Sequence, residues 1–171
     1  MLEKFDHYRL GETDQLVDID TAEEHRDAIL HMARQSMRSI HIISRALDPQ
    51  IYDSQELSDA LTNMVLEHRR VKILILVFDC SAIVSRGHRL VEAAHRLSSF
   101  FDIRTPGPEF KDYNSGVFIA DATGYVQRQT ATRYEGQVNF NDARHARIEI
   151  KTFEEMWGKA TLDSNLRRIK I

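Results

Sequence analysis

The sequence predicts an α/β protein with a mixed, largely parallel β-sheet sandwiched between helices. Strand-like apolar runs alternate with amphipathic helical segments along most of the chain, and this alternation is typical of a sheet covered by helices. The segment Val71–Phe78 is almost wholly apolar, as expected for a central strand that is buried on both faces. The predicted order of elements is β-α-β-α-β-α-β-β-β-α.

The first helix is predicted to begin at a capping box. Leu16–Ile19 alternates like a short strand, and Thr21 then stands three residues before Glu24. In this arrangement the Thr21 hydroxyl accepts from the amide of Glu24, and the Glu24 carboxylate reaches back toward the helix start. Apolar residues recur at helical spacing along the helix, namely Ile29, Met32, Ala33 and Met37.

A second strand, helix and strand follow. Ser39–Ser44 is short and β-rich, which predicts a buried strand. Asp53 and Glu56 form a second capping box, and the helix after it has an amphipathic pattern. The apolar positions of that pattern are Leu57, Ala60, Leu61, Met64 and Val65. The strand Val71–Phe78 comes next.

The second half of the chain is predicted to hold a helix, three strands and a final helix. Leu90, Ala94 and Leu97 form the apolar stripe of the first of these helices, which precedes a strand at Phe100–Arg104. The strands 117–120 and 125–127 form a hairpin around an Ala-Thr-Gly turn. Asp142 caps the final helix, whose apolar residues are Ala146, Ile150, Phe153, Trp157 and Ala160.

Composition indicates one domain over residues 1–171, with its core between about residues 15 and 160. A net charge of −3 argues against electrostatic binding to nucleic acid or to an anionic membrane. Cys80 is the single cysteine, and neither a signal peptide nor a membrane-spanning apolar run is present, so a cytoplasmic location is expected. The sequence contains neither a glycine-rich phosphate loop nor histidines and cysteines at metal-ligand spacing, so no cofactor and no metal are expected.

Residues 113–121, Tyr-Asn-Ser-Gly-Val-Phe-Ile-Ala-Asp, follow a Pro-Gly-Pro loop and precede a Thr-Gly turn. With the element order of residues 21–160, this setting resembles one half of the phospholipase D superfamily. Asp121 matches the Asp of the family signature His-x-Lys-x4-Asp, but Asn114 stands at the His position and Gly116 at the Lys position. Asn139 matches the Asn of the family's Gly-Ser-x-Asn motif, in which Gln137 replaces Ser.

The resemblance implies a catalytically degenerate domain. In the family the signature His attacks phosphorus, and neither an Asn amide nor a Gly can act as nucleophile or supply positive charge. The expected function is therefore binding of an anionic or phosphate-containing ligand, or of a protein partner. Because two halves face each other in the family, the resemblance also implies a homodimer.

A second resemblance concerns an uncharacterised bacterial phospholipase D-like family whose members also lack the signature. It is carried by His7–Gly11, Arg45–Pro49, Gly87–Leu90 and Phe153–Trp157. Some members of that family follow an acyltransferase domain of the GNAT type. A regulatory or interaction module for an acyltransferase is therefore an alternative function.

Candidate ligand-binding residues are those at the carboxyl ends of the strands, where open α/β sheets bind ligands. Arg45, Asp48 and Asp79 lie there. Two further candidates are His88, near a helix N-terminus that can bind an anion, and Arg128, on the strand after Asp121. An Arg there can hold a phosphate, but Arg45 can equally pair with Asp48 or Asp79 to fix the loop. His88 can equally cap a helix. A further alternative is a phosphodiesterase or nuclease that uses His88 or His145 as base or nucleophile.

Overall fold

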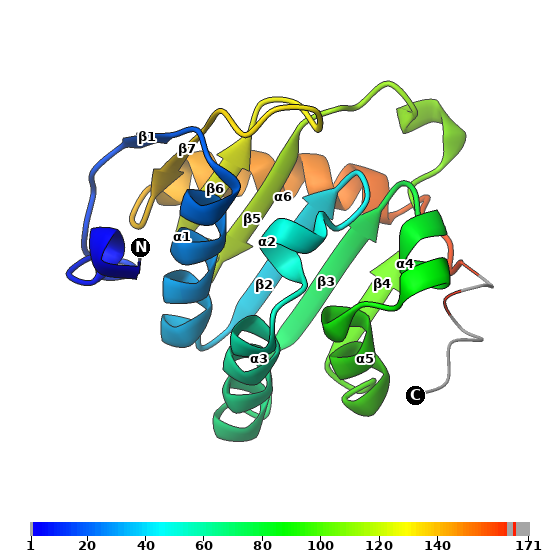
Figure 1. The fold of residues 1–171 in the computed structure, drawn as a ribbon, viewed down its shortest axis with the longest axis horizontal. Coiled ribbons are helices and arrows are strands. Elements are labelled where there is room, and N and C mark those ends of the chain that lie inside the picture. Colours follow the sequence, from blue (N-terminus) through cyan, green and yellow to red (C-terminus); the bar gives the residue numbers. More distant parts are fainter. Residues whose placement is uncertain (1, 164–165, 167–171) are drawn as a thin grey trace.

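The computed structural model describes residues 2–163 and 166. They form a seven-stranded sheet in the order β1-β7-β6-β5-β2-β3-β4, with helices on both faces (Figure 1). The strands are β1 Val17–Ile19, β2 Ser39–Ser44, β3 Lys72–Val77, β4 Phe101–Arg104, β5 Gly116–Ala120, β6 Gly124–Arg128 and β7 Gly136–Asn139. The predicted α/β sandwich is confirmed. The sequence did not predict β7.

The sheet is mixed, but the expectation that it is largely parallel is wrong. Only β2, β3 and β4 pair in parallel, whereas β5 pairs antiparallel with both β2 and β6, and β7 pairs antiparallel with β6 and β1. The connections explain the difference. Helices link the three parallel strands, but β5 and β6 are joined by a tight turn, which permits only antiparallel pairing.

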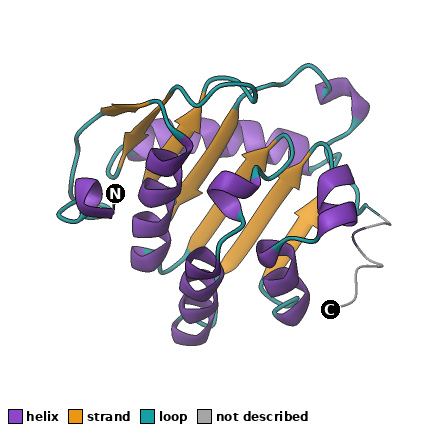
Figure 2. Cartoon of the chain, viewed as in Figure 1, coloured by secondary structure: helices purple, strands orange, loops and turns teal. Residues whose placement is uncertain are grey.

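A group of helices covers one face of the sheet, and a long helix covers the other face (Figures 1 and 2). The first group comprises α1 Ala22–Gln35, α2 Pro49–Tyr52, α3 Gln55–Glu67, α4 Ser81–Arg86 and α5 Arg89–Arg96. Alone on the opposite face lies α6 Ala143–Trp157, and two 3-10 helices are formed by Leu2–Phe5 and Pro108–Phe110. None of the helices in the described part of the chain is both long and apolar enough to cross a membrane.

Two of the three predicted helix caps are confirmed. The Thr21 hydroxyl accepts from the Glu24 amide at 3.1 Å, and the Asp142 carboxylate accepts from the His145 amide at 3.0 Å. The third cap is Ser54 rather than Asp53, because the Ser54 hydroxyl accepts from the amide of Leu57 at 3.2 Å. Asp53 instead follows α2 and accepts from the amide of Arg89 at 2.9 Å.

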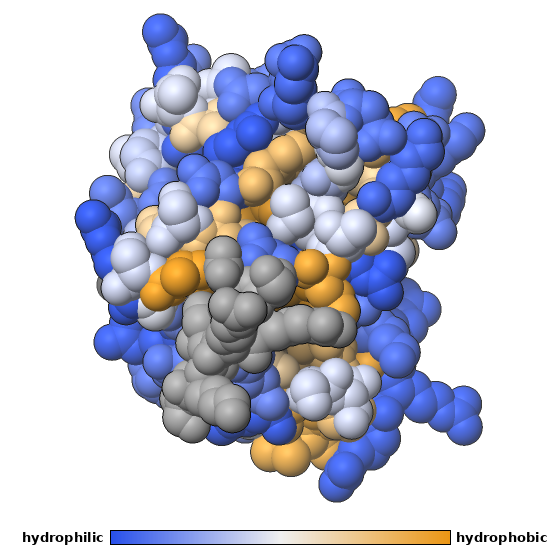
Figure 3. All heavy atoms as spheres, turned by 90° about the vertical axis from the view of Figure 1, so that its right-hand side faces the viewer, coloured by the Kyte–Doolittle hydropathy of each residue, from blue (hydrophilic) through white to orange (hydrophobic). Residues whose placement is uncertain are grey.

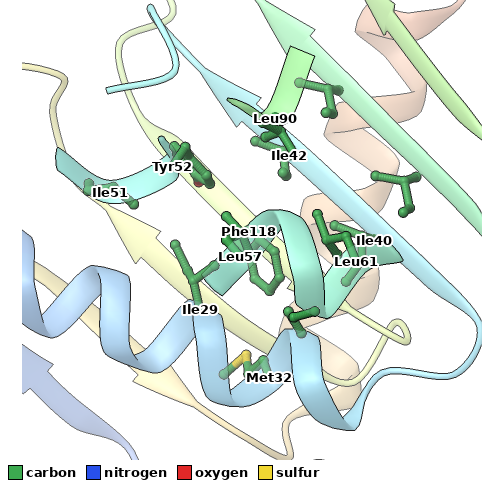
Figure 4. Packing of buried hydrophobic residues seen from close by; sticks show 14 of the residues in the cluster. Ile29, Met32, Ile40, Ile42, Ile51, Tyr52, Leu57, Leu61, Leu90 and Phe118 are labelled. Atoms are coloured by element: carbon green, nitrogen blue, oxygen red, sulfur yellow. The ribbon is translucent and has the colours of Figure 1, made fainter. Parts of the chain in front are cut away.

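The larger hydrophobic cluster lies between the sheet and the five helices α1–α5 (Figure 4). Ile29 and Met32 of α1 and Leu61 of α3 pack there over Ile40 and Phe118 of the strands. The smaller cluster lies under α6 and includes Ile43, Leu76, Val117, Ile119 and Phe153. Met37 does not belong to the core: it lies beyond the end of α1 and is 56% exposed.

The face that carries β4, α4 and α5 is largely hydrophilic (Figure 3). Apolar side chains form patches near the middle of this view (Figure 3). This face is distinct from the edge of the sheet at which β2 and β6 end, where the candidate site lies.

Candidate functional site

A cavity of about 230 Å³ opens where β2 and β6 end and β5 begins. These three ends meet because β5 runs antiparallel to both neighbours. The wall is mostly apolar and includes Ile29, Ile51, Val117 and Val126, and its polar groups come from His25, Ser44, Arg45, Asp48, Tyr52, Ser115 and Arg128. We call it the β2–β5–β6 cavity. It contains three of the five predicted ligand-binding residues.

Arg128 and Asp48 form an ion pair at this cavity. Arg128 Nη1 lies 3.3 Å from Asp48 Oδ2, and its Nη2 donates to the carbonyl of Ala131 at 2.9 Å. The guanidinium stacks over the ring of Tyr134, 4.4 Å from its centroid, while the Tyr134 hydroxyl donates to Asp48 Oδ2 at 2.8 Å. Asp48 also caps α2 through the amide of Gln50. Its cationic partner is therefore Arg128 rather than Arg45.

Arg45 is held by carbonyl groups. Its Nη2 donates to the carbonyls of Lys111 and Tyr113, and the guanidinium stacks over Phe78, 4.3 Å from the ring centroid. Among the described residues, no carboxylate lies within ion-pair distance of Arg45. The alternative in which Arg45 pairs with Asp48 or Asp79 is therefore wrong for the described part of the chain.

Asp79 lies outside the cavity and is exposed. Its Oδ1 accepts from the amide of Ser81 at 3.0 Å and from the Ser81 hydroxyl at 2.6 Å. These hydrogen bonds, more than the charge of Arg45, hold the pKa of the Asp79 carboxyl below its usual value. The carboxylate thus stabilises the turn after β3.

His88 also lies outside the cavity, and both of its ring nitrogens are occupied. Nε2 donates to the carbonyl of Leu47 at 3.0 Å, and Nδ1 accepts from the amide of Leu90 at 3.1 Å. Burial lowers the pKa of the ring, which is 5% exposed. A neutral His88 therefore caps α5, as the structural alternative predicted, and offers no free nitrogen to a ligand.

His145 lies on the opposite face of the sheet, in the first turn of α6. Its Nε2 is 2.8 Å from Gln127 Oε1 and 3.6 Å from Glu149 Oε1. The ring also packs on Tyr125, with 4.1 Å between centroids. His145 therefore cannot reach a ligand in the β2–β5–β6 cavity.

The four positions matched to the family signatures lie in different places. Gly116 lines the cavity and pairs directly with Arg128 across the strands, whereas Asn114 is exposed in the preceding loop. Asp121, at the far end of β5, is 6% exposed and accepts from the amides of Met37, Arg38 and Ser39, the shortest of these bonds being 2.8 Å. Asn139 Nδ2 donates to Asp14 at 3.0 Å, also away from the cavity.

The sequence did not identify four polar residues of the cavity, namely His25 of α1, Ser44 of β2, Tyr52 of α2 and Ser115. His25 is 2% exposed, and its Nε2 lies 2.7 Å from the carbonyl of Tyr134. Tyr52 is the last residue of α2, and its ring belongs to the core cluster (Figure 4). The available signal was the position of His25 four residues before Ile29, on the buried stripe of α1.

No group of three His, Cys, Asp or Glu side chains within residues 2–163 and 166 is placed to share a metal ion. The polar groups of the cavity are two guanidinium groups, one carboxylate, one imidazole and three hydroxyls. Such a set can bind and orient a small molecule through hydrogen bonds and charge.

Solved structures share the fold at low sequence identity. TrmBL2, described as an archaeal chromatin protein with a novel mode of DNA binding, matches with a TM-score of 0.61 and 18% identity over 93% of this chain. The match covers 55% of TrmBL2, so this chain spans about half of that protein.

Nuc from Salmonella typhimurium, a phospholipase D family member, matches with a TM-score of 0.61 and 14% identity, covering 86% of this chain and 96% of Nuc. NucT from Helicobacter pylori matches with a TM-score of 0.58 and 13% identity, covering 87% of this chain and 99% of NucT.

No curated protein sequence matches the chain. A family model described as "Domain of unknown function (DUF7931)" matches residues 21–169, which is most of the chain. The chain has a phospholipase D-like fold, as its sequence predicted, and it belongs to the DUF7931 family.

Proposed function

We propose that this protein binds a small anionic, phosphate-containing molecule in the β2–β5–β6 cavity and does not carry out the covalent hydrolysis of the phospholipase D superfamily. By the resemblance, the phosphate-binding Lys of the signature corresponds to Gly116. Gly116 lines the cavity, so the cavity occupies the region into which that Lys would project.

The observation that carries the proposal is the pairing of Gly116 with Arg128. The two residues lie directly opposite each other on β5 and β6, and side chains of such pairs point to the same face of a sheet. A Cβ atom on Gly116 would be 3.8 Å from the Cβ of Arg128. Arg128 therefore supplies, from the neighbouring strand, a positive charge beside the position where the signature has Lys.

Arg128 retains donors for a ligand. A guanidinium carries five N–H groups, and its planar fork suits phosphate oxygens. Three donor contacts are made within the protein, to Arg133, Ala131 and Asp48. These contacts and the Tyr134 ring hold the whole guanidinium group in place. The group therefore loses little entropy when its remaining N–H donors bind a ligand. The cavity volume is below the roughly 300–1,000 Å³ of sites for drug-sized ligands, which favours a small anion.

The family's covalent route lacks its reactive groups. Asn114 offers no nucleophile, His88 has both nitrogens engaged, and His145 lies on the other face of the sheet. These placements disfavour the alternative of a phosphodiesterase or nuclease that uses His88 or His145. Binding without turnover is the function that the residues of the cavity support.

The test is a phosphate titration of the whole protein, followed by thermal unfolding and calorimetry. Phosphate at about a hundred times its dissociation constant should raise the melting temperature by roughly 5–10 °C. Arg128→Gln should weaken binding at least about tenfold, because it removes the cation. Asp48→Asn should strengthen binding several-fold, because it removes a negative charge but keeps an oxygen for Tyr134 and Gln50.

Opposite effects of these two substitutions on phosphate affinity would identify an anion site. If Arg128 and Asp48 form only a structural ion pair, both substitutions should instead lower the stability of the protein to a similar extent. Arg133→Gln is the matched control, since the Arg133 side chain is 73% exposed and pairs only with Glu135 among the described residues. Phosphate binding that is equal in Arg128→Gln and Arg133→Gln would overturn the proposal.

The remaining expectations, about partners and cellular location, stay predictions. They are a homodimer, an acyltransferase partner and a cytoplasmic location. Although TrmBL2 is described as binding DNA, the net charge of −3 gives this chain no general attraction to nucleic acid. We therefore do not propose nucleic-acid binding.

A further inference from the structure

Tyr52 brings an unused hydrogen-bond donor to the β2–β5–β6 cavity. The residue is 6% exposed and lines the cavity, and its hydroxyl makes no hydrogen bond to a described residue. Burial raises the pKa of Tyr52, and the hydroxyl therefore carries its proton at neutral pH.

His25 brings an unused acceptor to the same cavity. Its Nε2 lies 2.7 Å from the carbonyl of Tyr134, and because a carbonyl can only accept, Nε2 must carry the hydrogen. Burial lowers the pKa of His25, which keeps the ring neutral at neutral pH. Nδ1 then presents a lone pair, and no described residue donates to it.

The charges of Arg128 and Asp48 influence the pKa of both Tyr52 and His25, because the four groups lie close together. The cavity therefore combines donors from Tyr52 and Arg128 with one neutral acceptor on His25. A complementary ligand needs several acceptor oxygens and one donated hydrogen. A singly protonated phosphate or phosphomonoester has both, and this form is populated near neutral pH because its second pKa is about 6.

We propose that the cavity selects inorganic phosphate or a phosphomonoester, with P–OH donating to His25 Nδ1 and the other phosphoryl oxygens accepting from Tyr52 and Arg128. This inference rests on the proposed anion binding and narrows its ligand class. A phosphodiester has no P–OH group, and sulfate carries no proton at neutral pH. Both would leave the His25 lone pair unmatched, and a site built for a donor disfavours such analogues strongly.

The first experiment uses the unmodified protein. Calorimetry at fixed pH 6.5 and ionic strength compares inorganic phosphate, methyl phosphate, dimethyl phosphate and sulfate. Phosphate and methyl phosphate should bind at least about tenfold more tightly than dimethyl phosphate and sulfate. Equal binding of all four anions would overturn the selection but leave the proposed anion site intact. Binding of none would overturn both.

The second experiment tests the two residues by substitution. Tyr52→Phe removes only a hydroxyl that has no described protein partner, so stability should be unchanged while phosphate affinity falls roughly tenfold. Tyr125→Phe is the matched control, since Tyr125 is also buried but lies under α6. His25→Leu removes the acceptor and should abolish the preference for phosphate over sulfate. If phosphate binds Tyr52→Phe and the unmodified protein equally, Tyr52 has no part in the site.

Discussion

Asp121 joins two distant parts of the chain. Its carboxylate accepts from three successive backbone amides at the start of β2, and its own amide donates to the carbonyl of Ser39 at 2.8 Å. The residue has a positive φ of 53°, which Asp tolerates better than most residues. Asp121 therefore fixes the β5–β6 turn against β2, which is a structural role.

Asp121→Ala should lower the free energy of unfolding by about 3 kcal/mol. The substitution leaves buried amides without their acceptor and puts a Cβ-only side chain at a positive φ. Asp121→Asn should cost less, because Asn tolerates this backbone and keeps one acceptor oxygen. Chemical denaturation measures both, with the exposed Asp112→Ala as control. Equal stability of the Asp121→Ala and Asp112→Ala variants would contradict this role.

At the scale of elements, the start of α5 is tied to the loop after β2. His88 caps α5 and donates to Leu47, while Asp53 accepts from the amide of Arg89. Leu47 is fully buried and has a positive φ of 51°. These contacts hold the Arg45–Pro49 loop, from which Asp48 reaches the cavity, in a conformation that Leu would not adopt by itself.

His88→Ala should destabilise the protein by about 2 kcal/mol, since the cap and the bond to Leu47 are both lost. His88→Asn should recover about half of this loss, because Asn is a good cap but is too short to replace the ring. Urea unfolding of these variants is compared with His7→Ala, in which an exposed His is removed. If His88→Asn lowers the free energy of unfolding as much as His88→Ala does, the cap contributes little to stability.

At the scale of the whole molecule, burial of neutral histidines couples stability to pH. His25, His41 and His88 all have lowered pKa values because burial disfavours the charged ring, and the pKa of His41 falls to about 4. His41 packs edge-on against Phe153 on the α6 face, and its Nδ1 has no described partner. Such groups bind protons more readily in the unfolded chain than in the folded one.

Stability should therefore decrease as the pH falls below about 6.5, the ordinary pKa of His. For His41 the loss accumulates between about pH 6.5 and pH 4 and then levels off, and it reaches about 3 kcal/mol at most. Melting temperatures at pH 7.5 and 5.0 measure the effect, and His41→Leu should reduce the difference between them. A melting temperature that does not change between these pH values would contradict the prediction.

The sequence by itself determined the elements that carry strong local signals. The bounds of β2 were predicted correctly from a β-rich run, and α1 and α6 begin at the predicted caps, because capping and periodicity depend on neighbouring residues. The absence of a His at position 114 and of a Lys at position 116 was visible as well, since it depends only on residue identity. The short α2, α4 and β7 were not predicted, because few residues give little periodicity.

Only the tertiary structure decided which residues share the cavity. Arg128 and Asp48 are 80 positions apart, and α1 brings His25 to the same wall because β5 and β6 fold back beside β2. Conversely, His88 lies outside the cavity because it caps α5, and His145 lies on the opposite face of the sheet. The pairing of strands that are distant in the sequence determines such contacts, and it cannot be predicted from neighbouring residues alone. Arg128 lies opposite Gly116 across β5 and β6, in a position that strand register alone defines.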